Sequence, residues 1–465
     1  MRIEFLGGVG TVTGSRTMLT TRAGRVLVDC GLFQGLKSLR LKNWDQFPAE
    51  PKSVKAIFLT HAHLDHSGYL PRLVKEGFRG PIYCSMPTAD LCKILLFDSA
   101  KLMEEEARYA NKRGYSKHAP ALPLYESTDV ERTLSLFEPM EVDVPFEANG
   151  MRVDFFKVGH ILGACGIRLC GISQEDATSD ATSDATSIVF SGDLGRPHDE
   201  VMVSPDAPLE SDYLVVESTY GDRRHPHETP LDELANCIHD ALKSGGVLLI
   251  PAFTVGRAQQ LLYSIARLKK EKRIPAIPVH VDSPMATDVT ELYLKSTGFH
   301  RLGPEECVEM LRDDVHFVRS AEDSRKLDEA GPARIIISAS GMATGGRVLH
   351  HLSALASDDR NTILFAGFQA SGTRGAALVS GVDEIKMHGQ YVKIRAKVKN
   401  LGSFSAHADC DETLSWLAAR PMAKPLKRIF LNHGEPAAAD ALRRRIGERF
   451  GWACSIPNIG DSWDL

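Results

Sequence analysis

The sequence has no long apolar run and no paired cysteines, and each absence excludes a class of protein. No run of about eighteen apolar residues occurs in the 465-residue chain, which excludes a membrane-spanning helix. The first ten residues read as a strand and a turn rather than as a basic segment followed by an apolar one, so we expect no signal peptide. The nine cysteines are scattered and form no Cys-x-x-Cys pair. This argues against a disulfide framework and a thiolate zinc site, and it favours a reducing, cytoplasmic compartment.

Composition and charge are typical of a globular protein and point to no particular partner. Hydrophobic residues make up 43% of the chain and charged residues 25%, and the formal net charge is −5. No global basic field therefore indicates a nucleic-acid partner, although a local basic groove is compatible with these values. The length fits about two to four domains.

The first third of the chain alternates short β-branched or apolar runs with glycine turns, which predicts strands. The expected strands cover residues 2–6, 17–20, 25–29, 56–60, 81–84, 152–158, 166–170 and 187–191, with helices over 68–75 and 91–113. Residues 176–187 are three tandem copies of Asp-Ala-Thr-Ser. A small polar repeat cannot bury apolar area, so we interpret it as a flexible hairpin-loop insertion without a role in the chemistry.

From about residue 211 the pattern changes to repeated strand–helix units. Apolar strands are expected over 247–250, 279–281, 334–338 and 362–366, with a helix over 257–270. Uniformly apolar strands are typical of parallel sheets covered by helices on both faces. The closing strand and helix, over 428–431 and 437–450, are expected to return to the first domain. The predicted organisation is therefore 1–210, an inserted domain over 211–395, and 396–465.

The most informative segment is the histidine-rich motif that follows the strand over 56–60. Its sequence is His61-Ala62-His63-Leu64-Asp65-His66. Three imidazoles and a carboxylate cannot be hidden in a core without partners, and loops at the carboxyl ends of strands are where α/β folds place ligands. In an extended loop, His61 and His63 can face one metal ion while Asp65 and His66 face another about 3.5–4 Å away. Imidazole and carboxylate ligands without thiolates suit zinc, with manganese or iron as the alternatives.

Further ligand candidates also follow apolar strands and lie beside glycine. They are His160 in Val158-Gly159-His160, Asp193 in Ser191-Gly192-Asp193, and His433 in Asn432-His433-Gly434. Each alone would be an ordinary loop residue. Beside the histidine motif, they indicate that a site with two metal ions is completed from several strand ends.

Together with Asp29, these residues resemble the signature motifs of the metallo-β-lactamase superfamily, in the same order and at strand ends. The resemblance implies the αββα sandwich of that superfamily and two zinc ions, with Mn²⁺ as the alternative metal. The implied ligands are His61, His63, His160 and Asp193 for one ion, and Asp65, His66, Asp193 and His433 for the other. Asp193 would bridge the ions, and Asp29 would hydrogen-bond a ligand or its loop, an orienting role that metal sites need.

A long insertion separates Asp193 from His433, an arrangement similar to the β-CASP nucleases, a family that includes RNase J and the pre-mRNA 3′-end endonuclease. Segments 216–221, 404–409 and 432–435 look like motifs A, B and C of that family. The implied fold is α/β, a metallo-β-lactamase sandwich with an inserted β-CASP domain in which helices flank a parallel sheet. Family members often have an arginine after a Gly-Thr-x-Gly turn, whereas Arg374 precedes the second glycine here. Phosphate binding by Arg374 is therefore left open.

The resemblance also implies roles in phosphodiester hydrolysis, which needs a nucleophile, neutralisation of charge and a proton for the leaving oxygen. Metal ions supply the first two, because they lower the pKa of bound water to about 7. The implied catalytic residues are Asp65, Glu217 and His407. His407 would be the general acid on the leaving 3′-oxygen and Glu217 would position it, whereas the alternative makes His407 a substrate-binding residue only.

Substrate binding is expected at Ser405, which would hydrogen-bond the scissile phosphate, and in the loop that contains Ser340 and Gly341. Backbone N–H groups of this glycine-rich loop could face a neighbouring phosphate, although a tight turn after a buried strand is an equal alternative. Basic residues at 393, 395, 397 and 399 alternate with period two, which would place them on one face of a strand. They could follow a phosphate backbone or guard a solvated edge strand.

The favoured function is a zinc-dependent ribonuclease that acts on single-stranded RNA and yields 5′-phosphate and 3′-hydroxyl ends. The choice of RNA rests on resemblance, because members with histidine in motif C, as at His433, mostly act on RNA. Endonucleolytic cleavage is favoured over 5′-exonucleolytic cleavage without being fixed by the sequence. A DNA nuclease and a catalytically inactive RNA-processing scaffold are the alternatives, and a homodimer is one option for the oligomeric state. A small-molecule hydrolase would leave the insertion without a purpose.

Overall fold

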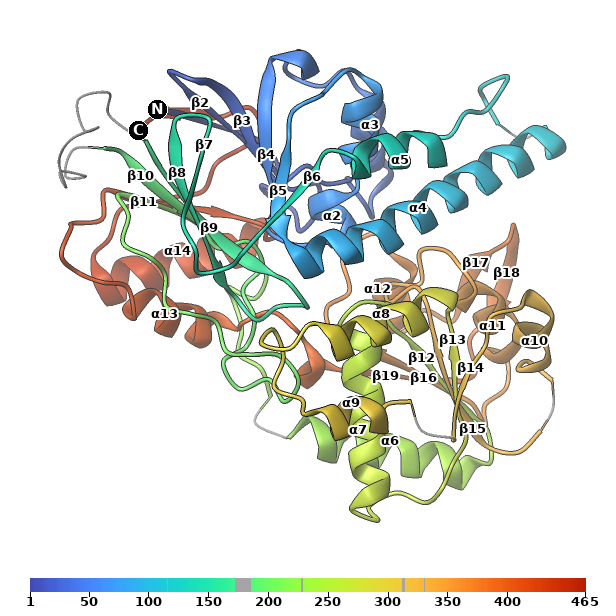
Figure 1. Cartoon of the computed structure of the whole chain (residues 1–465). Helices are drawn as coiled ribbons and strands as arrows, with labels where there is room; N and C mark the ends of the chain where they lie inside the picture. Colours follow the sequence, from blue (N-terminus) through green and yellow to red (C-terminus); the bar gives the residue numbers. More distant parts are fainter. Residues whose placement is uncertain (115, 172–184, 227–228, 312–313, 330) are drawn as a thin grey trace. The chain divides into compact units, whose positions relative to one another are not determined.

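The computed structural model describes residues 1–114, 116–171, 185–226, 229–311, 314–329 and 331–465. Most of the predicted Asp-Ala-Thr-Ser loop therefore lies outside the described residues. The chain forms two compact units, unit 1 with Met1–Arg224 and His407–Leu465, and unit 2 with His225–Ala406 (Figure 1). Throughout the described ranges, no helix is long and apolar enough to cross a membrane.

Unit 1 contains two β-sheets. The strands of the first are β1 (Arg2–Gly7), β2 (Arg16–Thr21), β3 (Gly24–Val28), β4 (Val54–Phe58), β5 (Ile82–Ser85), β6 (Phe137–Met140) and β22 (Ser462–Asp464), in the order β22-β1-β2-β3-β4-β5-β6. The strands of the second are β7 (Phe146–Ala148), β8 (Met151–Lys157), β9 (Cys165–Gly171), β10 (Ser187–Phe190), β11 (Tyr213–Glu217), β20 (Arg428–Asn432) and β21 (Cys454–Ser455), in the order β21-β20-β11-β10-β9-β8-β7. The first and last parts of the chain contribute strands to both sheets.

The two sheets of unit 1 pack face to face through aromatic side chains. The ring of Phe5 in β1 lies 5.4 Å from the ring of Phe430 in β20, and the ring of Tyr83 in β5 lies 5.3 Å from that of Phe146 in β7. Trp463 of β22 also contacts Phe430, at 4.9 Å between centroids. Tilted and edge-on ring pairs at such distances add to the hydrophobic stabilisation of a core. The αββα sandwich implied by the sequence is therefore present.

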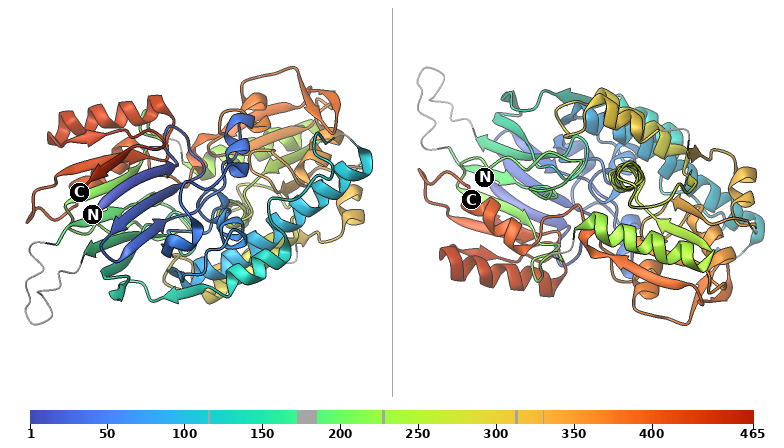
Figure 2. Two further views of the ribbon diagram at one scale, coloured as in Figure 1. Left: turned by 90° about the horizontal axis from the view of Figure 1, so that it is seen from above. Right: turned by 90° about the horizontal axis from the view of Figure 1, so that it is seen from below.

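Helices cover the outer faces of both sheets (Figure 2). They are α1 (Lys37–Leu41), α2 (Leu64–Ser67), α3 (Leu70–Lys75), α4 (Met86–Arg113) and α5 (Ser127–Leu134) in the first part of the chain, and α13 (Cys410–Ala418) and α14 (Pro436–Phe450) in the last; short 3₁₀ turns are η1 (Lys42–Trp44) and η2 (Pro51–Ser53). The long helix α4 begins where the hydroxyl of Ser85 accepts a hydrogen bond from the Thr88 N–H, and it ends at Gly114 with φ +66°. A hydroxyl N-cap and a left-handed glycine C-cap are standard helix boundaries.

Unit 2 is built around a parallel sheet. Its strands are β12 (Val247–Pro251), β13 (Val279–Asp282), β14 (Val315–Phe317), β15 (Arg334–Ser338), β16 (Thr362–Ala366) and β19 (Lys397–Leu401), in the order β14-β13-β15-β12-β16-β19. Its helices are α6 (Pro230–Ser244), α7 (Arg257–Lys270), α8 (Pro284–Lys295), α9 (Pro304–Glu309), α10 (Ala321–Lys326), α11 (Val348–Leu355) and α12 (Arg374–Val379), and η3 (Gly402–Phe404) follows β19. A hairpin of β17 (Glu384–Met387) and β18 (Gln390–Lys393) lies between α12 and β19.

Both faces of the sheet in unit 2 are buried, as the uniformly apolar strands predicted. Leu249, Ile336 and Ile363 pack in one core with side chains of α11, α12 and β17. Their neighbours along the strands, such as Leu248 and Ile335, point to the opposite face and are also buried. The α/β architecture of the insertion is thus the one that the sequence predicted.

The structure differs from the sequence reading at the edges of unit 2. The first predicted domain boundary followed residue 210, yet β11 pairs in parallel with β10 and β20 and so lies in unit 1. The prediction of a single strand with four basic residues on one face is wrong. Lys393 ends β18 and Lys397 begins β19, with Arg395 between the two strands. Lys399 is also paired, because its Nζ lies 2.7 Å from Asp240 Oδ2.

Candidate metal centre

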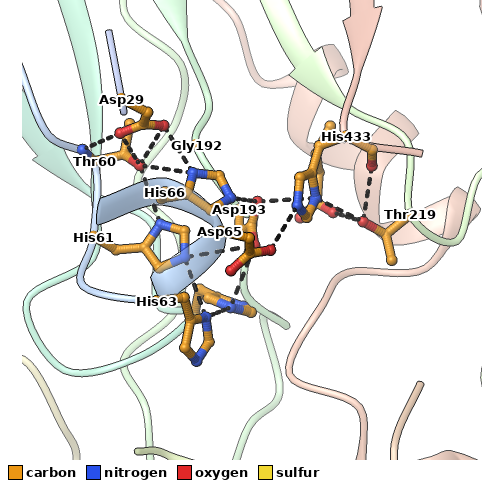
Figure 3. Close-up of polar contacts among 12 residues, drawn as sticks. Asp29, Thr60, His61, His63, Asp65, His66, Gly192, Asp193, Thr219 and His433 are labelled. Atoms are coloured by element: carbon orange, nitrogen blue, oxygen red, sulfur yellow. Dashed lines mark hydrogen bonds and ion pairs between the residues drawn. The ribbon is translucent and has the colours of Figure 1, made fainter. Parts of the chain in front are cut away.

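Strand ends bring the predicted ligands to one place in unit 1 (Figure 3). His61 follows β4, His160 follows β8, Asp193 follows β10 and His433 follows β20. Strands β8 and β10 are both antiparallel to β9, while β11 pairs in parallel with β10 and β20. Strands β8, β10 and β20 therefore run in one direction and end at one edge of the sheet.

The first ligand group consists of three imidazoles and one carboxylate. His63 Nδ1 lies 3.2 Å from His61 Nε2 and 3.3 Å from His160 Nε2. Asp193 Oδ2 lies 3.6 Å from both of these Nε2 atoms. The four ligand atoms lie within 4.8 Å of one another, and His63 is the partly exposed member of the group.

The spacing of this group fits a tetrahedral metal ion. Metal–nitrogen bonds of about 2.0–2.1 Å, as in zinc sites, place ligand nitrogens about 3.3–3.4 Å apart at the corners of a tetrahedron. The nitrogen–nitrogen distances of 3.2 and 3.3 Å correspond to such edges. A donor set of three imidazoles and a carboxylate without thiolates is also one that zinc accepts.

The second group surrounds the other carboxylate oxygen of Asp193. His66 Nε2 and His433 Nδ1 each lie 3.2 Å from Asp193 Oδ1, and Asp65 Oδ2 lies 3.3 Å from His433 Nε2. Within the described part of the chain, buried His66 Nε2 and Asp193 Oδ1 make no hydrogen bond. Buried polar atoms normally have hydrogen-bond partners. Two neighbouring buried atoms without such a partner fit a site at which both bind a metal ion. The two carboxylate oxygens of Asp193 thus face two separate groups of side chains.

The pKa values of His61, His63 and Asp193 are shifted in the direction that favours metal binding. Burial, and then the charge of His66, lowers the pKa of His61 well below its usual range, and burial lowers the pKa of His63 to about 4. Burial alone would raise the pKa of Asp193, but the nearby His433, His66 and His61 hold that pKa well below its usual range. Neutral imidazoles and ionised carboxylates are the forms that bind metals.

Asp29 and Thr60 hold the imidazoles of His61 and His66 in place. Asp29 Oδ2 accepts a hydrogen bond from His66 Nδ1 at 2.8 Å, and Asp29 Oδ1 accepts one from the Thr60 N–H at 2.8 Å. The hydroxyl of Thr60 lies 3.0 Å from both carboxylate oxygens of Asp29 and 3.1 Å from His61 Nδ1. These contacts leave Nε2 of both histidines directed at Asp193. Partners of this kind fix the orientation of ligand imidazoles and strengthen metal binding.

A second buried network joins Glu217 to His407. Glu217 Oε2 accepts hydrogen bonds from His407 Nδ1 at 2.9 Å and from the Thr219 hydroxyl at 2.5 Å, and Glu217 Oε1 accepts one from the Leu194 N–H. The backbone of His407 forms a β-bridge with Gly195, next to Asp193. The ring of His407 lies 4.5 Å from the ring of His160. His407 of motif B thus lies against the first ligand group.

The charge of Glu217 determines the protonation of His407. Burial acts against the charged imidazole, but the charge of Glu217 and its hydrogen bond outweigh burial and raise the pKa of His407 to about 9. Nδ1 of His407 is held by Glu217.

Sequence reasoning missed Thr60 and Thr219. The Thr219 hydroxyl oxygen lies 3.3 Å from His433 Nδ1 and 3.0 Å from the His433 carbonyl oxygen, so it links motif A to motif C. Each threonine is the second residue after the end of a strand that leads into the site. A hydroxyl at such a position is the available signal, but threonine is common at strand ends.

The predicted substrate-binding residues lie in unit 2. Ser340 and Gly341 follow β15, the Ser340 hydroxyl lies 3.0 Å from the Thr344 hydroxyl, and a side chain at Gly341 would meet Phe253. Ser405 follows η3 and is buried. Arg374, whose phosphate contact the sequence left open, donates to the carbonyl oxygens of Lys386 and Thr344 at 3.0 and 3.2 Å. Phosphate binding by Ser340, Gly341 and Ser405 stays a prediction.

An αββα sandwich with this histidine and aspartate set defines a metal-dependent hydrolase, and the comparisons with known proteins agree. Family models match residues 10–150 (metallo-β-lactamase superfamily), 258–378 (Beta-Casp domain) and 391–457 (Zn-dependent metallo-hydrolase RNA specificity domain). Ribonuclease TTHA0252 of Thermus thermophilus is 34% identical over 469 residues, which cover 99% of each chain. Transcription termination factor FttA of Pyrococcus abyssi is 30% identical, over 99% of this chain and 71% of that protein.

The chain belongs to the β-CASP ribonuclease family of the metallo-β-lactamase superfamily, and it is a metal-dependent hydrolase of the nuclease class. A crystal structure of a protein of unknown function from Enterococcus faecalis has the same fold, with a TM-score of 0.52 and 12% identity over 100% of this chain and 99% of that one. This likeness concerns the fold alone.

Proposed function

We propose that the chain is a dizinc ribonuclease that cleaves single-stranded RNA internally and leaves 5′-phosphate and 3′-hydroxyl ends. The observation that carries this proposal is the arrangement of two ligand groups around the two carboxylate oxygens of Asp193, with the Glu217–His407 pair against the first group. The RNA substrate is supported by the match to an RNA specificity domain and by the ribonuclease relative. A role in RNA processing or decay would follow.

We assign one zinc ion to His61, His63, His160 and Asp193, and the other to Asp65, His66, Asp193 and His433. When bound, a pair of zinc ions supplies a nucleophilic water of lowered pKa and neutralises charge on the phosphate. The structure supports this assignment through the tetrahedral edge lengths of the first group and the unsatisfied buried atoms of the second. His66 donates Nδ1–H to Asp29, which would leave Nε2 as the ligand atom.

We assign proton delivery to His407. A general acid must reach the leaving oxygen with a proton that it can release. Glu217 holds Nδ1, so the proton for the leaving 3′-oxygen would come from Nε2. Glu217 itself is buried and both its oxygens are engaged, which suits a positioning residue rather than a metal ligand. Asp65, partly exposed beside His433, completes the proposed catalytic set.

The proposal places the substrate phosphates on polar groups of unit 2. Ser405 would hydrogen-bond the scissile phosphate, and the loop with Ser340 and Gly341 would bind a neighbouring one through its N–H groups. A side chain at Gly341 would clash with Phe253, so this close packing of the loop requires glycine.

The test is cleavage of 5′-labelled and internally labelled single-stranded RNA, with the matched DNA alongside, by wild type and His407→Ala. We expect internal RNA fragments with 5′-phosphate ends, loss of cleavage on chelation, and a rate about 10²–10⁴ lower in the variant. Equal or faster cleavage of DNA would overturn the RNA assignment but not the metal centre. If wild type with two bound zinc ions cut neither polymer, a non-catalytic scaffold would be the better account.

A further inference from the structure

The β17–β18 hairpin of unit 2 presents a polar face that the proposed chemistry does not use. In its register Lys386 lies opposite Tyr391, and Glu384 lies opposite Lys393. Side chains alternate between the two faces of a hairpin, so these four share one face. Tyr391 is 67% exposed, and Lys386 Nζ lies 5.8 Å from the centre of its ring.

The other face of the hairpin anchors it to unit 2. Ile385 and Met387 are 8% and 1% exposed and pack in the core formed with α11, and Val392 packs against the same core. The Met387 sulfur also lies 3.9 Å from the Ser353 hydroxyl of α11. A guanidinium hydrogen bond from Arg374 to the Lys386 carbonyl at 3.0 Å adds a polar tie. The exposed face therefore sits on a fixed backbone, which lowers the entropy lost when a ligand binds it.

The cations on and beside this face are available to a ligand. Lys386, Lys393 and Arg395 are exposed, and among the residues that the structure describes none of their side chains forms an ion pair. By contrast, Lys399 of the neighbouring strand is paired with Asp240. Glu384 is the negatively charged residue on the face. The net charge of Lys386, Lys393, Arg395 and Glu384 together is therefore positive.

We propose that this hairpin face is a subsite for single-stranded RNA, in which Tyr391 stacks on a base and Lys386, Lys393 and Arg395 neutralise the flanking phosphates. The inference rests on the proposed RNA substrate. Aromatic rings bordered by cations are how proteins hold single strands without reading their sequence, because every base has a face to stack. The match to the RNA specificity domain begins at residue 391, so it includes the tyrosine and the two cations that follow.

The test compares Tyr391→Ala with wild type in two assays, both with the full chain loaded with zinc. Affinity is measured by fluorescence anisotropy of a labelled single-stranded RNA of about 12 nucleotides, with both proteins in a His407→Ala background that slows cleavage. Steady-state cleavage is measured in the wild-type background. We expect Kd and KM to rise about tenfold, with kcat within about twofold because the subsite touches no reacting atom.

Matched variants separate stacking from other causes. Tyr391→Phe keeps the ring and should bind RNA like wild type, and Tyr391→Trp should bind at least as well. Tyr109→Ala is the control, since Tyr109 is 53% exposed and lies 5.6 Å from the Arg113 guanidinium, but belongs to α4. Lys386→Gln and Lys393→Gln should each make the plot of log Kd against log salt concentration shallower by about 0.7.

Each outcome decides one claim. If wild type cleaves RNA and Tyr391→Ala leaves both Kd and KM unchanged, the subsite is refuted while the proposed function stands, and the lysines only guard the free edges of the hairpin. An equal loss in Tyr391→Phe would likewise contradict stacking. If wild type neither binds nor cleaves RNA, the proposed function itself fails.

Discussion

A buried ion network in unit 2 gives a quantitative prediction for stability. Asp282 at the end of β13 is fully buried, and it accepts hydrogen bonds from His351 Nε2 at 2.8 Å, Arg347 at 2.6 Å and the Ser324 hydroxyl at 2.6 Å. His351 Nδ1 contacts Asp328 Oδ1 at 2.6 Å. Replacing the histidine by His351→Gln removes the titrating ring and keeps a polar side chain. The variant should therefore be less stable than wild type.

The size and pH dependence of the effect follow from the pKa of His351. Burial opposes its charge, but the hydrogen bonds to Asp282 and Asp328 outweigh burial and raise the pKa from 6.5 to about 9. Because the folded value lies above the unfolded one, the stabilisation is fully present below about pH 6.5 and is lost as the pH rises through about 9. This rise in the pKa of His351 corresponds to roughly 3 kcal/mol. The destabilisation by His351→Gln should thus be about 3 kcal/mol larger at pH 6 than at pH 10.

Hydrogen exchange measured by mass spectrometry is the suitable assay. All four tryptophans (Trp44, Trp416, Trp452 and Trp463) lie in unit 1, so intrinsic tryptophan fluorescence would not report on unit 2. Protection of peptides from β13 and α11 in wild type and variant is compared at each pH, which cancels the intrinsic exchange rate. His239→Gln is the control, because His239 is exposed and contacts the Arg273 carbonyl rather than a carboxylate. A loss of protection in His351→Gln that is the same at pH 6 and pH 10 would refute the reasoning.

Two predictions concern the metal centre. Thr60→Val removes the hydroxyl that joins Asp29 to His61. It should weaken zinc binding about 10–100-fold, measured by competition with a chelator. Thr362→Val is the control, because this buried hydroxyl has no hydrogen bond among the described residues, and it should leave zinc affinity unchanged. Glu217→Gln should lower kcat on RNA by a factor of about 10²–10⁴, with two zinc ions still bound. The double variant with His407→Ala should be little slower than either single variant. If the two losses in kcat multiplied instead, the two residues would act separately.

The sequence predicted what is encoded locally. The expected strands over 334–338 and 362–366 and the helix over 257–270 coincide with β15, β16 and α7, because continuous apolar runs and a regular apolar stripe are local signals. The clustering of His61, His63 and His66 was also predictable, since they crowd into one short segment that no core could hold unpaired; their role as metal ligands stays a prediction. The structure brings these histidines together with His160, Asp193 and His433.

Features that depend on distant pairing were not predictable from one sequence. Strand β22 pairs with β1 at the opposite end of the chain, and nothing local distinguishes Ser462–Asp464 from a loop. The basic residues at 393–399 alternate as in one strand. In the structure, however, the Arg395 and Ala396 N–H groups donate to the Ala356 carbonyl oxygen, and these hydrogen bonds separate β18 from β19. Thr60 and Thr219 act through hydroxyl contacts with residues far away in the sequence, so their roles appear only in the folded chain.

The most direct test of the central claim is the number of metal ions bound, measured by native mass spectrometry on wild type, Asp193→Asn and His160→Ala, with RNA cleavage followed on the same samples. We predict two zinc ions per chain in wild type, one in His160→Ala and fewer than two in Asp193→Asn, with cleavage lost in both variants. Chelation should remove both ions and all cleavage, and zinc should restore both. A wild-type chain that binds one ion or none and still cleaves RNA at full rate would contradict the dinuclear centre.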